Sequence, residues 1–259
     1  MVEDSVRLRT LARFEAHRRA WRDNQALRLL YQRWYQRVRA ALPEQGPWVE
    51  LGSGPGLARE LVPELVLTDL VAAPWHDRQV DAQAMPFADG SVGALVLFDV
   101  LHHLPSLARF FAEATRVLRP GGRLVACEPY ASLLSYPVYR FFHEEGMTMR
   151  ADPWAEALDR VDPFESNQSG PTRIFAGGAR DLLRRFPAFR LVQLERLAGP
   201  AYPASGGFTR GPLLPLPLWR ALLAVEDRLP EMAFRLIGFR VLAVLERDAS
   251  APTVARVNP

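Results

Sequence analysis

The sequence predicts an α/β fold in which helices cover both faces of a doubly wound, mostly parallel sheet of seven strands. Two observations support this fold class. Short apolar runs alternate with segments of helical periodicity along most of the 259 residues, which is the pattern of consecutive β-α-β units. A glycine-rich turn also follows the first apolar run, as happens where a parallel strand passes into a helix.

The first half of the chain supplies five of the predicted strands. Apolar residues recur at three-and-four spacing over 23–42, which indicates an amphipathic helix capped by Asp23 or Asn24. A brief helix is expected at 57–61, and a longer one at 107–117. The strands are expected at 48–51, 65–69, 79–81, 94–98 and 123–127.

After residue 130 the regular alternation breaks. An aromatic-rich segment at 131–175 is interpreted as an inserted lid after strand five, over the carboxyl edge of the sheet. The α/β pattern then resumes with a helix at 179–186 and strands at 189–195 and 239–246, while 199–238 contains a helix at 218–229. We expect one domain over 1–259, composed of N-terminal helices (1–45), a half that contains the glycine turn (46–130) and two cover segments (131–175 and 199–238).

Composition and charge exclude several classes of binding partner. The 32 basic residues, all arginine, outnumber the acidic ones by only three, and they are scattered without a dense basic block among aromatics. Nucleic-acid binding is therefore not expected. Cys127 is the single cysteine, so we expect no internal disulfide and a cytoplasmic location. No cluster of cysteine and histidine has the spacing of a zinc site, so we expect no metal. No apolar run is long enough to span a membrane, which leaves peripheral contact open.

Acidic residues stand at three successive strand ends. Glu50 precedes the turn Gly52-Ser53-Gly54-Pro55-Gly56, whose glycines permit positive φ and close approach of a ligand to the backbone. Asp69 ends the second strand, where a carboxylate can accept hydrogen bonds from both hydroxyls of a ribose, and Asp81 ends the third, where it can accept from an adenine amine. Because the carboxyl ends of parallel strands meet at the switch point of the sheet, these groups are expected to converge on one ligand.

These motifs resemble the class I S-adenosylmethionine (SAM) dependent methyltransferases, especially the small-molecule branch similar to the ubiquinone and menaquinone biosynthesis enzymes. The resemblance covers about residues 48–130 and is carried by 50–56, 68–69, 81–87, 89–91, 100–104 and 117–122. It implies a Rossmann-like fold with SAM as cofactor. Glu50 and the glycine turn would hold the amino-acid part of SAM, Asp69 the ribose and Asp81 with Ala82 the adenine. The implied cofactor-binding residues are Glu50, Gly52, Ser53, Gly54, Gly56, Asp69, Leu70, Asp81, Ala82, Phe98 and Asp99.

Two alternative functions share part of this pattern. An NAD-dependent oxidoreductase would use the glycine turn and Asp69, but its fingerprint wants a third glycine three residues after the second, whereas Pro55 and Gly56 follow Gly54 directly. A SAM-binding scaffold or sensor without turnover would keep every binding residue. An open space in front of the reactive methyl would distinguish an enzyme from such a scaffold.

The acceptor is expected to be a small molecule methylated on oxygen or carbon. Phe98-Asp99-Val100-Leu101 differs from the Asn/Asp-Pro-Pro-aromatic motif of enzymes that methylate amide or base nitrogens. The aromatic insert favours an apolar or aromatic acceptor, although the same residues can equally form the core that attaches the insert to the sheet. His102 or His103 could act as a general base, or could serve only in packing and cofactor contact. His143, with Glu144 and Glu145 in the insert, is a further candidate, and these three could equally form a solvated loop cluster. The sequence does not predict the oligomeric state.

Overall fold

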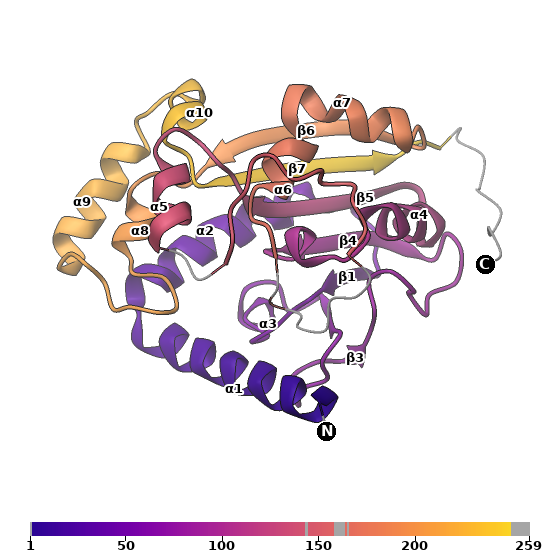
Figure 1. Cartoon of the computed structure of the whole chain (residues 1–259), viewed down its shortest axis with the longest axis horizontal. Helices are drawn as coiled ribbons and strands as arrows, with labels where there is room; N and C mark the ends of the chain where they lie inside the picture. The colour runs from indigo at the N-terminus through magenta and orange to yellow at the C-terminus, as the bar shows by residue number, and fades with distance from the viewer. Residues whose placement is uncertain (1, 143–144, 158–163, 165, 250–259) are drawn as a thin grey trace.

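A seven-stranded sheet lies at the centre of the molecule, in the strand order β3-β2-β1-β4-β5-β7-β6 (Figure 1). The computed structural model describes residues 2–142, 145–157, 164 and 166–249. Strand β7 runs antiparallel to both of its neighbours, and the other pairs are parallel. The strands are β1 Trp48–Leu51, β2 Val66–Asp69, β3 Arg78–Gln79, β4 Val92–Phe98, β5 Leu118–Pro129, β6 Phe189–Leu197 and β7 Arg240–Arg247.

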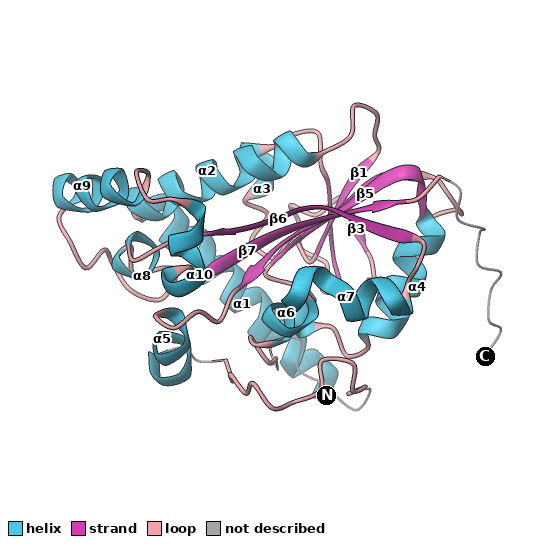
Figure 2. Cartoon of the chain, turned by 90° about the horizontal axis from the view of Figure 1, so that it is seen from above, coloured by secondary structure: helices cyan, strands magenta, loops and turns pink. Residues whose placement is uncertain are grey.

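Helices cover both faces of this sheet, as the sequence predicts. Helices α2 and α3 lie on one face, and α4, α6 and α7 lie on the other (Figure 2). The helices are α1 Val2–Asp23, α2 Gln25–Ala41, α3 Ala58–Leu61, α4 Leu107–Val117, α5 Ser135–Phe142, α6 Gly170–Ile174, α7 Ala176–Arg185, α8 Ala201–Ala204, α9 Leu216–Glu226 and α10 Phe234–Ile237, with short 3₁₀ helices at Leu101–His103 and Glu231–Ala233. The predicted doubly wound, Rossmann-like architecture is confirmed.

Alternation along the central strands divides the core into two layers. Every residue of β4 is buried. Val96 and Phe98 pack in the cluster that contains α2, whereas Leu95 and Leu97 pack in the cluster that contains α4. Because successive side chains of a strand point to opposite faces, an uninterrupted apolar strand requires cover on both sides.

Several element boundaries differ from the sequence prediction, most clearly those of β3, β5 and α9. Strand β3 ends at Gln79, so Asp81 does not end a strand as predicted but lies in the turn that follows, where its Oδ1 accepts from Gln83 N (2.8 Å). Strand β5 begins at Leu118 rather than at residue 123, because its pairing with β4 continues through an irregularity between Val92 and Ala94. Helix α9 begins and ends two to three residues earlier than predicted.

The N-terminal helix α1 lies beside the glycine turn. Arg18 Nη1 donates to Pro55 O (2.8 Å), and Trp21 Nε1 donates to Glu60 Oε2 (3.0 Å). Asn24 ends this helix and caps the next one by accepting from Leu27 N (3.0 Å), which decides between the two predicted caps. Its Nδ2 also donates to Ser205 O (2.8 Å). The N-terminal helices are thus fastened to the turn and to a segment nearly two hundred residues away.

Candidate functional site

A cavity of about 910 Å³ opens at the carboxyl ends of β1, β2 and β4. Ten of the eleven predicted cofactor-binding residues line it, and Gly56 is the exception. His102 and His103 also line the cavity, whereas the third histidine candidate, His143, lies outside the described residues. The lining cofactor residues are Glu50, Gly52, Ser53, Gly54, Asp69, Leu70, Asp81, Ala82, Phe98 and Asp99.

The turn after β1 requires glycine for its shape. Gly52 and Gly56 have φ of +65° and +71°, and a Cβ on them would lie 2.5 Å from Val100 Cγ2 and 2.4 Å from Trp75 Cδ1. Gly56 therefore shapes the turn against Trp75 instead of facing the cavity. Gly54 N donates to Asp69 Oδ2 (2.8 Å), and Trp75 Nε1 donates to Gly54 O (2.7 Å). These two hydrogen bonds fix the backbone of the turn at Gly54, where it lines the cavity.

Two buried carboxylates face this turn. Glu50 is 1% exposed; Tyr35 OH donates to its Oε1 (2.6 Å), and its buried Oε2 has no hydrogen-bond partner within the described part of the chain. Asp69 accepts from Gly54 N and from Val71 N (2.9 Å). Burial raises the pKa of both carboxyl groups, against the opposing effect of these hydrogen bonds. A cationic ligand group would favour their charged forms.

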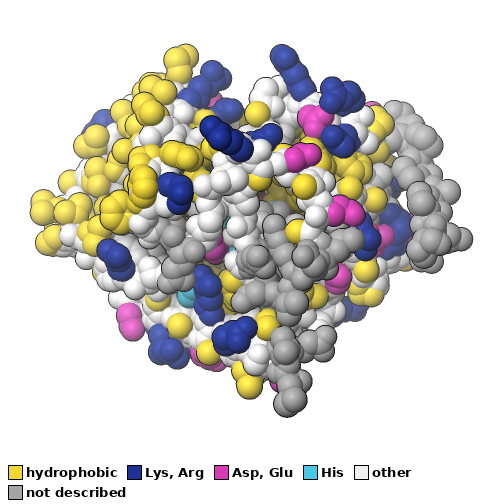
Figure 3. Space-filling model, viewed as in Figure 1, with side chains coloured by type: hydrophobic (Ala, Val, Ile, Leu, Met, Phe, Trp, Pro, Cys, Tyr) yellow, Lys and Arg dark blue, Asp and Glu magenta, His cyan; other side chains and the backbone are white. Residues whose placement is uncertain are grey.

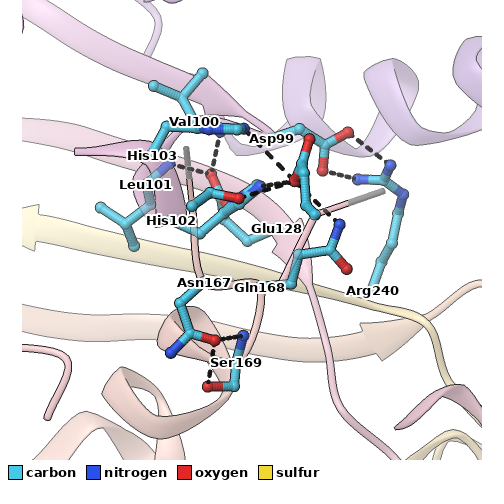
Figure 4. A network of polar contacts seen from close by, with 12 residues as sticks. Asp99, Val100, Leu101, His102, His103, Glu128, Asn167, Gln168, Ser169 and Arg240 are labelled. Atoms are coloured by element: carbon cyan, nitrogen blue, oxygen red, sulfur yellow. Dashed lines mark hydrogen bonds and ion pairs between the residues drawn. The ribbon is translucent and has the colours of Figure 1, made fainter. Parts of the chain in front are cut away.

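Asp99, which is partly exposed, forms an ion pair with the buried Arg240 of β7. Its two oxygens accept from the two terminal guanidinium nitrogens at 2.7 Å each (Figure 4). The guanidinium carbon also lies 4.5 Å from the Trp34 ring centroid, 4.9 Å from that of Phe98 and 5.0 Å from that of Tyr202. Such stacking is favourable for a desolvated cation. Asp99 thus lines the cavity with its carboxylate already held in a fixed orientation.

His102 lies between two carboxylates from different segments. Its Nδ1 is 2.7 Å from Oε2 of Glu128, at the end of β5, and its Nε2 is 3.3 Å from Oε2 of Glu145, in the insert (Figure 4). Glu128 is fully buried, and its Oε1 accepts from the amides of Val100 (2.9 Å) and Leu101 (2.8 Å). The network therefore joins two strand ends of the sheet to the insert.

The two carboxylates hold His102 in its protonated form. Burial alone lowers the pKa of His102, but its hydrogen bonds to Glu128 and Glu145, and their charges, outweigh burial and raise the pKa to about 10. Burial raises the pKa of Glu145, and the hydrogen bond and charge of His102 reverse this and hold that pKa well below its usual range. At neutral pH His102 is an imidazolium that donates on both sides.

This network predicts a specific pH dependence of stability. Since the folded pKa of His102 is about 10 and the unfolded value is about 6.5, its contribution is complete below pH 6.5 and is lost as the pH rises toward 10. The contribution of Glu145, whose pKa is lowered, is present above about pH 4.5. We expect the difference in free energy of unfolding between wild type and His102→Gln to shrink between pH 6.5 and 9.5. Urea titrations across this range check it, and a constant difference would contradict the assignment.

The same side chains form a set that could approach a metal ion. One ligand atom each from His102, His103 and Glu145 lies within 4.8 Å of the others. A histidine must lose its proton to bind a metal, and here the proton on His102 is stabilised by two carboxylates. We therefore retain the expectation that no metal takes part, as a prediction.

Several cavity residues are outside the sequence prediction. They are Thr10, Arg13, Phe14 and His17 of helix α1. Glu145 of the insert, which enters the sequence prediction only as a neighbour of His143, lines the cavity as well. Burial lowers the pKa of His17 to about 4, with Arg13 adding to the effect. The N-terminal residues lie outside every recognisable motif, so only the tertiary fold places them here. The position of Glu128 could have been noticed in the sequence, because it is an acid at the end of an apolar strand, as Glu50 is.

Comparison with known proteins gives the family of this region. Residues 49–126 match the family model for a methyltransferase domain. Demethylmenaquinone methyltransferase of Tropheryma whipplei is 37% identical over 59 residues, which are 22% of this chain and 25% of that protein. Ubiquinone/menaquinone biosynthesis C-methyltransferase of Desulfotalea psychrophila is 34% identical over 71 residues, 27% of this chain and 29% of that protein.

Residues 49–126 of the chain thus correspond to a methyltransferase domain. The matched part of the chain spans less than a third of the length of either methyltransferase named above. A solved SAM-dependent methyltransferase of Archaeoglobus fulgidus has 12% identity and a TM-score of 0.49, over 85% of this chain and 94% of that one. The cofactor of this methyltransferase domain is SAM.

The residues of the methyltransferase domain fit SAM chemically. The buried Oε2 of Glu50 is a suitable acceptor for the α-ammonium group of SAM. Asp69 retains lone pairs beside its two backbone donors, so it can also accept from ribose hydroxyls. Asp81 and Ala82 line the cavity beyond Asp69, where the resemblance expects adenine. These assignments of individual residues remain predictions.

Proposed function

We propose that this protein transfers the methyl group of SAM to an oxygen or carbon atom of a small apolar or aromatic acceptor. One observation carries the proposal: a single cavity of about 910 Å³ joins the predicted cofactor residues to an apolar wall. The volume lies near the upper end of the roughly 300–1,000 Å³ typical of ligand pockets. The lining extends from the predicted cofactor residues to aromatic residues of the cover segments, which supports a second space for an acceptor beside the cofactor. A scaffold without turnover would have no use for that second space.

The residues of the chain mainly bind, orient and exclude water. Bound SAM supplies a methyl group that is already activated on a sulfonium, so no protein nucleophile is required. Glu50 and Asp69 fix the cofactor end of the cavity, and Phe98, stacked on Tyr35 at 4.8 Å, forms an apolar wall between its two ends. Holding the two reactants in line in a site without water supplies a large part of the rate acceleration of a methyl transfer.

The acceptor end of the cavity is lined by apolar and aromatic groups. They come from the insert, from the segment after β6 and from the start of β7, which supports an apolar acceptor. The lining groups are Val138, Tyr139, Phe142, Phe164, Tyr202, Phe208, Leu213 and Phe239. A cytoplasmic location, expected from the single cysteine, remains part of this proposal.

His103 is the better candidate for removing a proton from the acceptor. His102 is held as an imidazolium by Glu128 and Glu145, and a protonated ring cannot accept a proton. His103 lines the cavity, is 17% exposed at its side chain and has its Nε2 3.8 Å from Glu145. We assign to His102 the role of orienting Glu145 and to His103 the contact with the acceptor.

Turnover with labelled SAM tests this function. Protein, methyl-labelled SAM and a panel of phenols, quinols and simple amines are incubated, and the label is followed into organic extracts. We expect label in a phenol or quinol product, at least tenfold less with His103→Gln, and no loss after treatment with a chelator. Glu64→Ala, which removes an exposed partner of Arg39, is the control. Label only in amine products, or in none, would refute the proposal, and loss after chelation would refute the prediction of no metal.

A further inference from the structure

The exposed apolar side chains of this protein gather at one end. Among the described residues, eleven of the fourteen large hydrophobic side chains that are exposed belong to the two cover segments, and ten of these, all except Met149, come from residues 133–142 and 213–236. We call these ten residues the apolar end. They are Leu133, Leu134, Tyr136, Phe141, Phe142, Leu213, Leu218, Val225, Met232 and Leu236.

The two segments lie side by side in space. Leu134 N donates to Leu236 O (3.0 Å), and Tyr130 OH donates to Arg235 O (3.3 Å), which joins the start of α5 to α10. Figures 1 and 2 place α5, α8, α9 and α10 together at one end of the sheet. Figure 3 shows hydrophobic side chains gathered over this end. Contiguous exposed apolar surface of this kind usually marks an interaction site.

Helix α9 presents an apolar face away from the protein. Trp219 and Glu226 are buried; Trp219 Nε1 donates to Ala201 O (2.8 Å), and Glu226 accepts from the amides of Gly199 and Ala201. Leu218 and Val225, seven residues apart, are 59% and 56% exposed. A helix that only covers a core has a polar outer face, so the outer face of α9 indicates a second apolar environment.

The charges around this surface are mainly positive. Residues 131–142 and 199–238, which carry the apolar end, have five exposed arginines against two exposed acids, and one of the acids, Asp227, is paired with Arg33. Arginine side chains beside exposed aliphatic and aromatic groups suit the boundary between anionic headgroups and acyl chains. The five are Arg140, Arg210, Arg220, Arg228 and Arg235.

The apolar end also borders the cavity. Phe142 and Leu213, 75% and 62% exposed, line the cavity together with Arg210. We propose that the apolar end binds the surface of an anionic lipid membrane, with the acceptor side of the cavity toward the bilayer. No helix in the described part of the chain is long and apolar enough to cross a membrane, so the proposed contact is at the surface. A lipid-dissolved acceptor would then enter from the membrane, and this last step alone rests on the proposed function.

Vesicle flotation tests the proposal without SAM or acceptor. Purified full-length protein is floated with vesicles of phosphatidylcholine alone and of phosphatidylcholine with 30 mol% phosphatidylglycerol, a composition that we choose. We expect flotation with the anionic vesicles that weakens as salt rises. The double variant Leu218→Ser/Val225→Ser should partition at least about tenfold more weakly, and each of Arg220→Gln and Arg228→Gln about fivefold more weakly.

A matched control separates this surface from general hydrophobicity. Leu8→Ser/Val192→Ser removes a leucine and a valine that are 67% and 41% exposed outside the apolar end, and it should float like wild type. Thermal unfolding and SAM titration of all variants verify the fold and separate this test from that of methyl transfer. No flotation with anionic vesicles, or flotation unchanged in Leu218→Ser/Val225→Ser, would overturn the proposal. So would a dimer in sedimentation equilibrium that this variant dissociates, because a second copy would then cover the surface.

Discussion

Replacing Asp69 by alanine is expected to weaken SAM binding about a hundredfold or more. The carboxylate accepts from the amides of Gly54 and Val71, and we expect it to accept from the ribose as well. A hydrogen bond to a charged group contributes about 1.5–3 kcal/mol, and 1.4 kcal/mol is a factor of about ten in affinity. Loss of two hydrogen bonds from the ribose hydroxyls to this carboxylate therefore accounts for the expected hundredfold weakening of SAM binding. Calorimetric titration with SAM, and separately with NAD, measures it.

Asp77→Ala is the matched control for this variant. Asp77 also follows β2 and accepts from a backbone amide, that of Leu67 (2.8 Å), but it does not line the cavity. It should bind SAM like wild type. A SAM affinity of Asp69→Ala within threefold of wild type would show that the carboxylate does not hold the cofactor. Tight binding of NAD by wild type would instead revive the oxidoreductase alternative.

Among the single substitutions proposed for this protein, Glu128→Ala is expected to lower the free energy of unfolding most. The substitution leaves two amide donors, of Val100 and Leu101, and the His102 imidazolium without their acceptor in the interior. Removing one partner of a buried pair costs about 3–5 kcal/mol. For a chain of this length each kcal/mol lowers Tm by roughly 2–4 °C. We expect Tm to fall by roughly 6–20 °C at pH 7, measured by circular dichroism.

Two comparison variants make this prediction specific. Glu128→Gln keeps an oxygen for the two amides and removes only the charge opposite His102, so it should lose less stability than Glu128→Ala. Asp181→Ala removes an exposed partner of Arg184 and Arg185, and such pairs contribute about 0–1 kcal/mol. A Tm decrease in Glu128→Ala no larger than in Asp181→Ala would contradict a structural role for the network.

The proposed membrane binding and the proposed methyl transfer are expected to be separable by substitution. The residues proposed to contact SAM lie on the strand ends and the glycine turn, whereas the apolar end belongs to the two cover segments. Variants of the apolar end should therefore retain SAM binding while losing vesicle binding. If the acceptor is lipid-dissolved, they should also be slower on acceptor presented in vesicles than on acceptor presented in detergent.

The sequence alone determined the elements whose signals are local. Short apolar runs located β1, β2 and β4, and apolar periodicity located α4, within one or two residues, because a parallel strand is covered on both faces and a helix on the sheet is covered on one. Glu50, the glycine turn and Asp69 were predictable together, because a strand end and the turn after it are adjacent in the chain. Their convergence on one cavity follows from the parallel arrangement that the alternation of strands and helices requires.

Only the tertiary structure decided which distant groups complete the site. Arg240 reaches Asp99 across 141 positions, and Glu145 reaches His102 from the insert, contacts that no local period encodes. They also decide the charge state of His102, which the sequence could only associate with an ordinary imidazole pKa near neutrality. Likewise, α5, α9 and α10 form one surface because packing brings two separate segments together. Pairings of this kind depend on chain crossings and on burial, and these are properties of the folded molecule.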